Sequence, residues 1–263
     1  IMTYFFIHTI KTSGTTFMEV IRKDAANNVG YFYPPKREMY DFEKRVKDAP
    51  FFNLEKNPDW QKFNFIGGHF TYGIHETLKA TDYTYLGVIR NPVEHYVSMY
   101  KHFLRMPAEY RKVIMGGTTD SIETLLSLNY THNMQTWFLS GLSMEEIRND
   151  KEKAVEVVIK NADKYFAGVY PTERFDEGLF YFKHKIGLRP QCYKRKNVSK
   201  NSTGEQLTSE LIQKIKAVND ADDKLFQYFS QKFDDELKNI QGIKREVAFF
   251  KLMNWLYQFR NKS

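Results

Sequence analysis

Residues 11–16, KTSGTT, have the side-chain types of an anion-binding turn. Glycine lets a ligand approach the backbone closely, hydroxyl groups donate hydrogen bonds, and lysine adds a mobile positive charge. In this interpretation Lys11 supplies the charge, Gly14 the close approach, and Thr15 and Thr16 the hydroxyls. The stretch differs from the nucleoside-triphosphate loop G-x-x-x-x-G-K-[ST], because here the lysine precedes the glycine.

Arg90 and Ser98 form a second pair of candidates. Arg90 follows the apolar run YTYLGVI, and Ser98 lies eight residues later, about two turns along a helix that Pro92 would open. A guanidinium fork and a hydroxyl at this spacing could converge on one phosphate. The alternative is an ordinary salt bridge of Arg90 and a small packing residue at Ser98. No acidic residue ends the run, so a magnesium ligand is not predicted there.

The elements that must position these residues alternate between strand and helix. Apolar runs predict strands at 4–8, 63–70, 83–90 and 164–169, and helical periodicity follows the first, third and fourth of them. This alternation predicts an α/β fold with a central, mostly parallel sheet flanked by helices on both faces. Segment 31–65 is predicted to be irregular. The aromatic end of the chain predicts a helical extension at about 240–263, packed on the core or resting on a membrane surface.

Composition limits the class of protein. The 263 residues fit a single domain, 1–263, and the net charge of +7 favours anionic partners such as a nucleotide, an acidic glycan, a nucleic acid or a membrane surface. A single cysteine, Cys192, excludes an intrachain disulfide and fits a reducing compartment. No apolar run approaches the roughly 20 residues of a membrane span, and the chain enters a strand without a secretory signal.

The motifs resemble those of sulfotransferases that use 3′-phosphoadenosine 5′-phosphosulfate (PAPS), of the glycan-modifying kind that includes heparan sulfate 2-O- and 6-O-sulfotransferases. FFIHTIKTSGTTF (5–17) resembles the 5′-phosphosulfate loop, and YLGVIRNPVEHYVSMYKHF (85–103) resembles the 3′-phosphate motif. Three further stretches resemble the same fold: IGGHFTYG (66–73), HNMQTWFLSG (132–141) and YKRKNVSKNS (193–202).

The resemblance implies a P-loop-like sulfotransferase fold, PAPS as the donor, adenosine 3′,5′-bisphosphate (PAP) as the product, and no metal. It implies that Lys11 contacts the phosphosulfate, that Arg90 and Ser98 bind the 3′-phosphate, and that His69 is the catalytic base. The remaining implied donor contacts are Thr12, Ser13, Gly14, Thr15 and Thr16 around the 5′-phosphate, and Arg195, Lys196 and Ser199 near the 3′-phosphate.

The implied reaction is an in-line transfer of a sulfuryl group from PAPS to an acceptor hydroxyl. His75, next to Glu76, is the rival base. The implied acceptor is a carbohydrate, and the basic segment 101–112, which includes His102, could contact an anionic glycan. A small alcohol or phenol is the alternative acceptor. Nucleic acid is not expected as a partner.

Three positions depart from the family pattern. Ile10 replaces the usual proline before the lysine, and His95 and Trp137 stand where arginine is common. His95 would then be a weaker cation, or one that titrates near neutral pH. These departures leave the identity of the acceptor open.

Two other functional classes also stay open. A magnesium-dependent nucleotide or small-molecule kinase would use the same strand-turn-helix junction, and a nonenzymatic polyanion-binding protein would explain the net charge. Animal members of the resembling family are lumenal Golgi enzymes with an N-terminal anchor. Because no such anchor precedes the first strand, we expect a cytoplasmic enzyme of bacterial or viral origin, with a lumenal fragment lacking its anchor as the alternative.

Overall fold

The computed structural model describes residues 2–32, 59–108, 111, 121–194 and 207–260. Five strands form one parallel sheet in the order β2-β3-β1-β4-β5. Their bounds are β1 Thr3–Ile7, β2 Val29–Phe32, β3 Phe65–Gly68, β4 Tyr83–Ile89 and β5 Phe166–Pro171. The α/β fold with a parallel central sheet is therefore confirmed.

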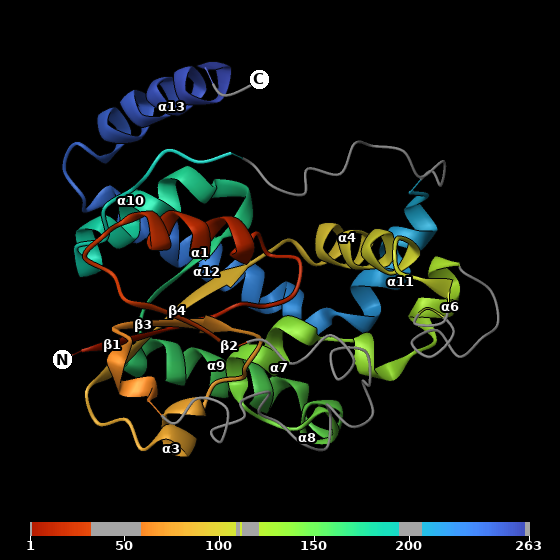
Figure 1. Cartoon of the computed structure of the whole chain (residues 1–263). Helices are drawn as coiled ribbons and strands as arrows, with labels where there is room; N and C mark the ends of the chain where they lie inside the picture. Colours follow the sequence, from red (N-terminus) through yellow and green to blue (C-terminus); the bar gives the residue numbers. More distant parts are fainter. Residues whose placement is uncertain (1, 33–58, 109–110, 112–120, 195–206, 261–263) are drawn as a thin grey trace.

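Helices cover both faces of the sheet (Figure 1). Their bounds are α1 Gly14–Lys23, α3 Ile74–Leu78, α4 Pro92–Leu104, α6 Ile122–Leu126, α7 Met134–Ser140, α8 Met144–Asn149, α9 Lys151–Tyr165, α10 Phe175–Ile186, α11 Ser209–Val218, α12 Asp220–Lys238 and α13 Ile243–Arg260. Three 3-10 turns add η3 Trp60–Lys62, η4 Asn129–Thr131 and η5 Thr172–Arg174.

The two faces of the sheet bury separate hydrophobic clusters, because successive side chains of a strand point to opposite sides. On β1, Phe5 and Ile7 join the cluster that includes side chains of α4, α7 and α9, whereas Phe6 joins the cluster of α1 and α10. Each of these three side chains is fully buried. The alternation fixes the register of β1 and with it the position of the turn that follows.

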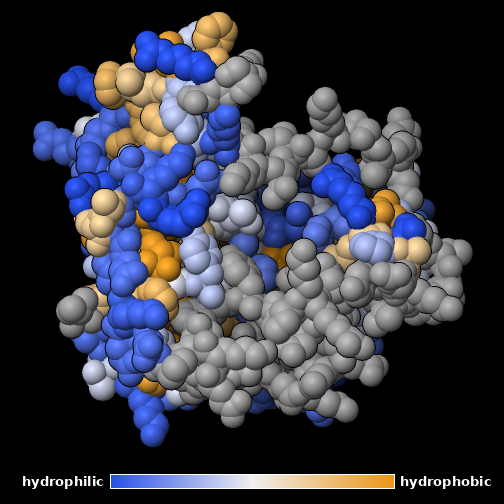
Figure 2. All heavy atoms as spheres, in the orientation of Figure 1, coloured by the Kyte–Doolittle hydropathy of each residue, from blue (hydrophilic) through white to orange (hydrophobic). Residues whose placement is uncertain are grey.

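The last helix, α13, packs on α10 with one face only. Val247, Phe250 and Asn254 are buried, whereas Phe249, Trp255 and others on the opposite side are more than half exposed. Figure 2 shows apolar side chains on the outer surface of this helix, at the top of the molecule. Of the two placements predicted for the aromatic end of the chain, the structure shows packing on the core along one face.

One strand differs from the sequence-based prediction. Val29–Phe32 forms the edge strand β2, paired in parallel with β3, although residues from 31 onward were expected to be irregular. The run is four residues long, includes a glycine and has a single neighbour, so it carries little of the periodicity that predicts a strand.

Candidate active site

The order of the strands in the sheet indicates where a ligand would bind. The chain runs from β1 to the edge strand β2, returns to β3 between β2 and β1, and then crosses to β4 on the other side of β1. The connections after β1 and β4 therefore diverge to opposite sides, and in open α/β sheets ligands bind outside the carboxyl ends of the strands at such a switch point. Lys11 follows β1 and Arg90 follows β4, so the two predicted anion-binding segments meet here.

The turn between β1 and α1 is held in an unusual backbone conformation. Lys11 and Ser13 both have positive φ angles, 66° and 62°, in the region that side-chain-bearing residues seldom adopt. The Thr12 hydroxyl donates to the carbonyl of Thr9 over 2.7 Å and closes the turn from inside. A Cβ on Gly14 would lie 2.0 Å from the His8 ring, so only glycine fits. Strain concentrated in one turn is typical of functional sites.

The amino end of α1 faces out of this turn. The helix begins at Gly14, and Ser13 at its N-cap makes no side-chain capping hydrogen bond. Ser13 and Thr15 are exposed, whereas Thr16 is buried and its amide donates to the Ser13 carbonyl. The helix dipole and the amides of the first turn make this end a suitable position for an anion.

Arg90 links the end of β4 to the turn that follows β1. Its guanidinium donates from Nη1 to the carbonyl of Lys11 over 3.0 Å and lies 3.6 Å from the carboxylate of Glu94. The side chain is about one quarter exposed, at 23%. The backbone of the turn therefore fixes the position of the arginine, which stays partly open to solvent.

One face of α4 lines the same turn. His95 Nε2 donates to the carbonyl of Ile10 over 2.7 Å, and Ser98 and His102 follow at spacings that place them on the same side of the helix. Burial lowers the pKa of His95 to about 4, with smaller contributions from Arg90 and Lys11. The sequence-based view of His95 as a weak or titratable cation is therefore wrong, because at neutral pH the buried ring is an uncharged donor.

Positive charge accumulates around the turn. Burial lowers the pKa of Lys11, and repulsion from Arg105 and Arg90 lowers it further. Burial, Lys11 and Arg105 together lower the pKa of His102 to about 4. Arg105 is a residue that the sequence analysis did not single out. Cations that lower one another's affinity for protons gain most from an anionic ligand placed between them.

His69 directly follows β3 and lies beside His8, which follows β1. Its Nδ1 is 2.6 Å from the carbonyl of His8, and the two imidazole rings are 4.5 Å apart. Because a carbonyl only accepts, Nδ1 carries the proton and Nε2 is the basic nitrogen of the neutral ring. Burial and the neighbouring His69 and Lys11 lower the pKa of His8 well below its ordinary range, so His8 is a neutral structural partner.

His75 lies in a different environment. Its Nδ1 is 2.8 Å from the hydroxyl of Tyr85, and its ring stacks on Tyr83 at 4.2 Å. Tyr83 begins β4, whereas Arg90 follows the end of that strand. His75 therefore lies near the amino ends of the strands, away from the turn. The structure thus brings His69, and not His75, to the turn.

The predicted site residues divide into two groups. The structure brings together Lys11, the turn residues 12–16, Arg90 and His69. Ser98 lies one turn after His95, whose ring bonds the carbonyl of Ile10. Arg195, Lys196 and Ser199 lie outside the described residues. Within the part of the chain that the structure describes, no helix is long and apolar enough to cross a membrane, and no group of three His, Cys, Asp or Glu is placed to hold a metal.

Sequence reasoning missed several supporting residues. Gln135 bonds both the amide and the carbonyl of Arg90, Thr172 donates to the carbonyl of Thr12 over 3.1 Å, and Glu173 accepts from the amide of Asn91. Thr172 and Glu173 directly follow β5, so the rule that carboxyl ends of parallel strands gather at one edge would have found them. Gln135 carries no such signal, because only the packing of α7 brings it to Arg90.

Comparison with known proteins identifies a family. The family model described as galactose-3-O-sulfotransferase matches residues 2–254. The chain is also similar to the galactosylceramide sulfotransferase of Bos taurus, with 22% identity over 265 residues. That alignment covers 95% of this chain and 61% of the relative, so the chain spans about three fifths of the relative's length.

These matches correct one expectation and replace two alternatives. The relative is a protein of Bos taurus, so the expected cytoplasmic enzyme of bacterial or viral origin is wrong. A sulfotransferase family takes the place of the kinase and of the nonenzymatic polyanion binder. Because the family model covers all but the ends of the chain, the chain belongs to the galactose-3-O-sulfotransferase family.

Proposed function

We propose that this protein transfers a sulfuryl group from PAPS to a galactose hydroxyl of a glycan or glycolipid. The observation that carries the proposal is the contact between the two anion-binding segments. The Arg90 guanidinium donates to the carbonyl of Lys11, so the end of β4 and the turn after β1 form one positively charged site. The family and the bovine relative supply the reaction type and the sugar.

The residues present fit a donor with two separate phosphate groups. The amino end of α1, with Ser13 and Thr15 exposed beside it, suits the 5′-phosphosulfate. Arg90 and Ser98 would hold the 3′-phosphate, because a partly exposed guanidinium binds phosphate through a two-pronged contact. The mutual repulsion that lowers the pKa of Lys11 is relieved when an anionic donor binds.

His69 is the proposed base. Its Nδ1 proton is engaged by the His8 carbonyl, so Nε2 takes the proton from the acceptor hydroxyl as that oxygen forms a bond to sulfur. The bond between sulfur and the bridging oxygen of the 5′-phosphate breaks, and its electron pair leaves with PAP. Lys11 and the first amides of α1 stabilise the charge that develops on the leaving oxygen.

The proposed acceptor is the 3-hydroxyl of a galactose residue, as the family description indicates. His102 and Arg105 follow Ser98 along α4 and lie close enough to Lys11 to affect its environment. In this proposal they contact a sugar, or an anionic group on it, that approaches Lys11 from the side opposite the donor.

Two measurements test the proposal. In a thermal-shift assay, PAP is expected to stabilise the protein more than AMP or ATP with magnesium does. Transfer of labelled sulfate from PAPS is expected with galactosylceramide or a galactose-terminated oligosaccharide, and not with a simple phenol. Stabilisation by ATP with magnesium alone would contradict the donor, and sulfation of the phenol alone would contradict the acceptor.

A further inference from the structure

The backbone of Arg90 is held by a side chain. Arg90 follows the last residue of β4, and the β4–β5 pairing ends at Ile89 and Pro171. Beyond that point Oε1 of Gln135 accepts from the amide of Arg90 over 2.7 Å, and Nε2 of Gln135 donates to the carbonyl of Arg90 over 2.9 Å. A primary amide presents one acceptor and one donor side by side, as a backbone peptide does, so Gln135 continues the ladder for one residue.

Gln135 is in turn fixed by a buried carboxylate. Gln135 and Asp222 are both fully buried. Asp222 accepts from the amide of Gln135 over 3.1 Å, and from the amide and the hydroxyl of Thr136 over 2.7 Å each. A fully buried carboxylate is retained only where such donors satisfy it, so Asp222 anchors the first turn of α7.

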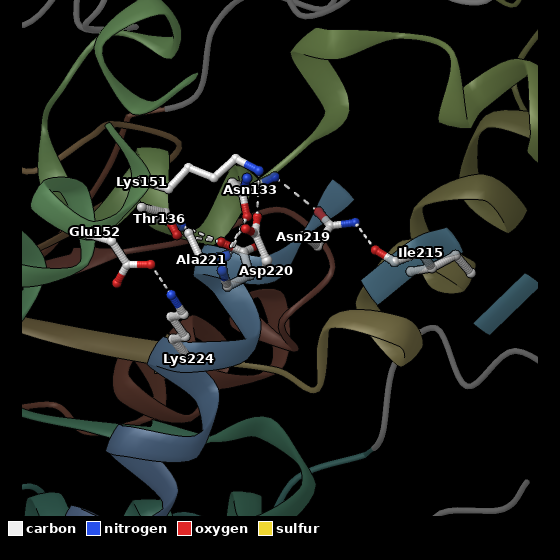
Figure 3. A network of polar contacts seen from close by, with 10 residues as sticks. Asn133, Thr136, Lys151, Glu152, Ile215, Asn219, Asp220, Ala221 and Lys224 are labelled. Atoms are coloured by element: carbon white, nitrogen blue, oxygen red, sulfur yellow. Dashed lines mark hydrogen bonds and ion pairs between the residues drawn. The ribbon is translucent and has the colours of Figure 1, made fainter. Parts of the chain in front are cut away.

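The amino ends of α7 and α12 cap each other, and Figure 3 shows the contacts of Asn133 and Asn219 that do so. The amide of Asn133 donates to the Asn219 side chain over 2.9 Å. The Asn133 side chain accepts from the amides of Ala221 and Asp222 over 3.0 and 3.2 Å. Two helices that are more than 80 residues apart in the chain are thereby joined rigidly, and α7 presents Gln135 at a fixed position.

We infer that Gln135, seated by Asp222, is a positioning residue for Arg90 and sets how strongly the site selects a donor that carries a 3′-phosphate. The inference rests on the proposed function, in which Arg90 binds that phosphate. The Gln135 side chain meets Arg90 at its backbone amide and carbonyl, so its effect on the donor passes through the arginine. A small displacement of a guanidinium that binds a phosphate with two prongs loses one of the two bonds.

The experiment compares PAP with AMP, which lacks the 3′-phosphate, in calorimetric titrations of the full chain. Gln135→Met keeps the length of the side chain and removes both hydrogen bonds. It is expected to weaken PAP binding about tenfold, the loss of one good hydrogen bond to a charged group, and to change AMP binding less than about twofold. Gln227→Met makes the same change on an exposed turn of α12 and is expected to leave both affinities unchanged.

Further variants keep the test decisive. Gln135→Asn serves if the methionine variant does not fold: its amide is one methylene shorter and loses at least one of the two hydrogen bonds to the Arg90 backbone, so the PAP preference falls again. In an Arg90→Gln background, Gln135→Met is expected to add almost no further loss, because both changes act through one guanidinium.

The possible outcomes distinguish the proposed donor from the proposed role of Gln135. A wild-type protein that binds PAP no better than AMP would overturn the proposed donor and this inference together. A wild-type preference for PAP that survives unchanged in the Gln135 variants would overturn the inference and leave the proposed function standing. A preference lost in the Gln135 variants and kept in Gln227→Met supports both.

Discussion

At the scale of single residues, the hydrogen bond of His69 to the His8 carbonyl assigns its proton to Nδ1 and its basicity to Nε2. If Nε2 is the base, His69→Ala is expected to lower kcat by roughly 10²- to 10⁴-fold while PAP binding changes little, because the imidazole acts on the acceptor. Sulfate-transfer kinetics beside PAP titrations measure both. His75→Ala is the control and should keep kcat within a few fold. A larger loss of kcat in the His75 variant would transfer the role to that residue.

His95 gives a prediction about pH. Burial lowers its pKa to about 4 in the folded state, below the value of about 6.5 expected for an unfolded chain. Folding therefore favours the neutral ring, and this contribution to stability is present above pH 6.5 and is lost as the pH falls toward 4. By linkage the loss at pH 5 is roughly 2 kcal/mol.

The test compares wild type with His95→Gln, whose amide can still donate to the Ile10 carbonyl. In urea unfolding, the stability difference between the two proteins should move in favour of the variant by about 2 kcal/mol from pH 7 to pH 5. Asp222, whose pKa burial raises to about 6, changes stability in the opposite direction over this range. It is present in both proteins and cancels. Parallel pH curves would show that His95 is not buried as a neutral ring.

At the scale of elements, the turn between β1 and α1 tolerates only glycine at position 14. In Gly14→Ala the new Cβ would lie 2.0 Å from the ring of the buried His8, so the turn or the ring must move. We expect a stability loss of about 1–3 kcal/mol and a loss of PAP binding, measured by urea unfolding and by titration. Gly187→Ala at the end of α10 is the control: with φ of 74° and nothing near its Cβ, it should cost about 1 kcal/mol and leave binding intact. Equal effects on binding would contradict a specific role of the turn.

The strands and helices also differ in how well the sequence predicts them. Apolar runs predicted β1, β3, β4 and β5 because these strands carry consecutive apolar residues that the fold buries. Such a run can be read from the local sequence alone. β2 was missed because it is only four residues long and its Tyr31 is exposed, so it lacks a buried apolar run. Lys11 and Arg90 were found because each directly follows a strand, whereas Gln135 and Asp222 reach the site only through the packing of α7 and α12. Local pattern predicts residues at element ends, and tertiary contacts decide what supports them.

At the scale of the whole molecule, α13 connects the C-terminal part of the chain to α10 and to the segment that follows it. The side chain of Asn254 accepts from the amide of Tyr193 over 2.8 Å, and Tyr193 packs against Phe175 and Phe250. The hydroxyl of Tyr193 donates to Asp176 at the start of α10. The helix therefore holds the segment after α10 in place at Tyr193.

The two faces of α13 should then respond differently to substitution. Asn254→Ala removes the acceptor of the Tyr193 amide in a buried environment, where Asn254 is 5% and Tyr193 1% exposed, so we expect a loss of about 1–3 kcal/mol in the free energy of unfolding. Leu252→Ala removes a side chain that is 54% exposed on the outer face and should change stability by less than about 0.5 kcal/mol. Urea unfolding of both variants beside wild type makes the comparison. Equal losses would mean that the outer face of α13 is covered in solution, since the exposed leucine can contribute as much as the buried asparagine only when another surface packs against it.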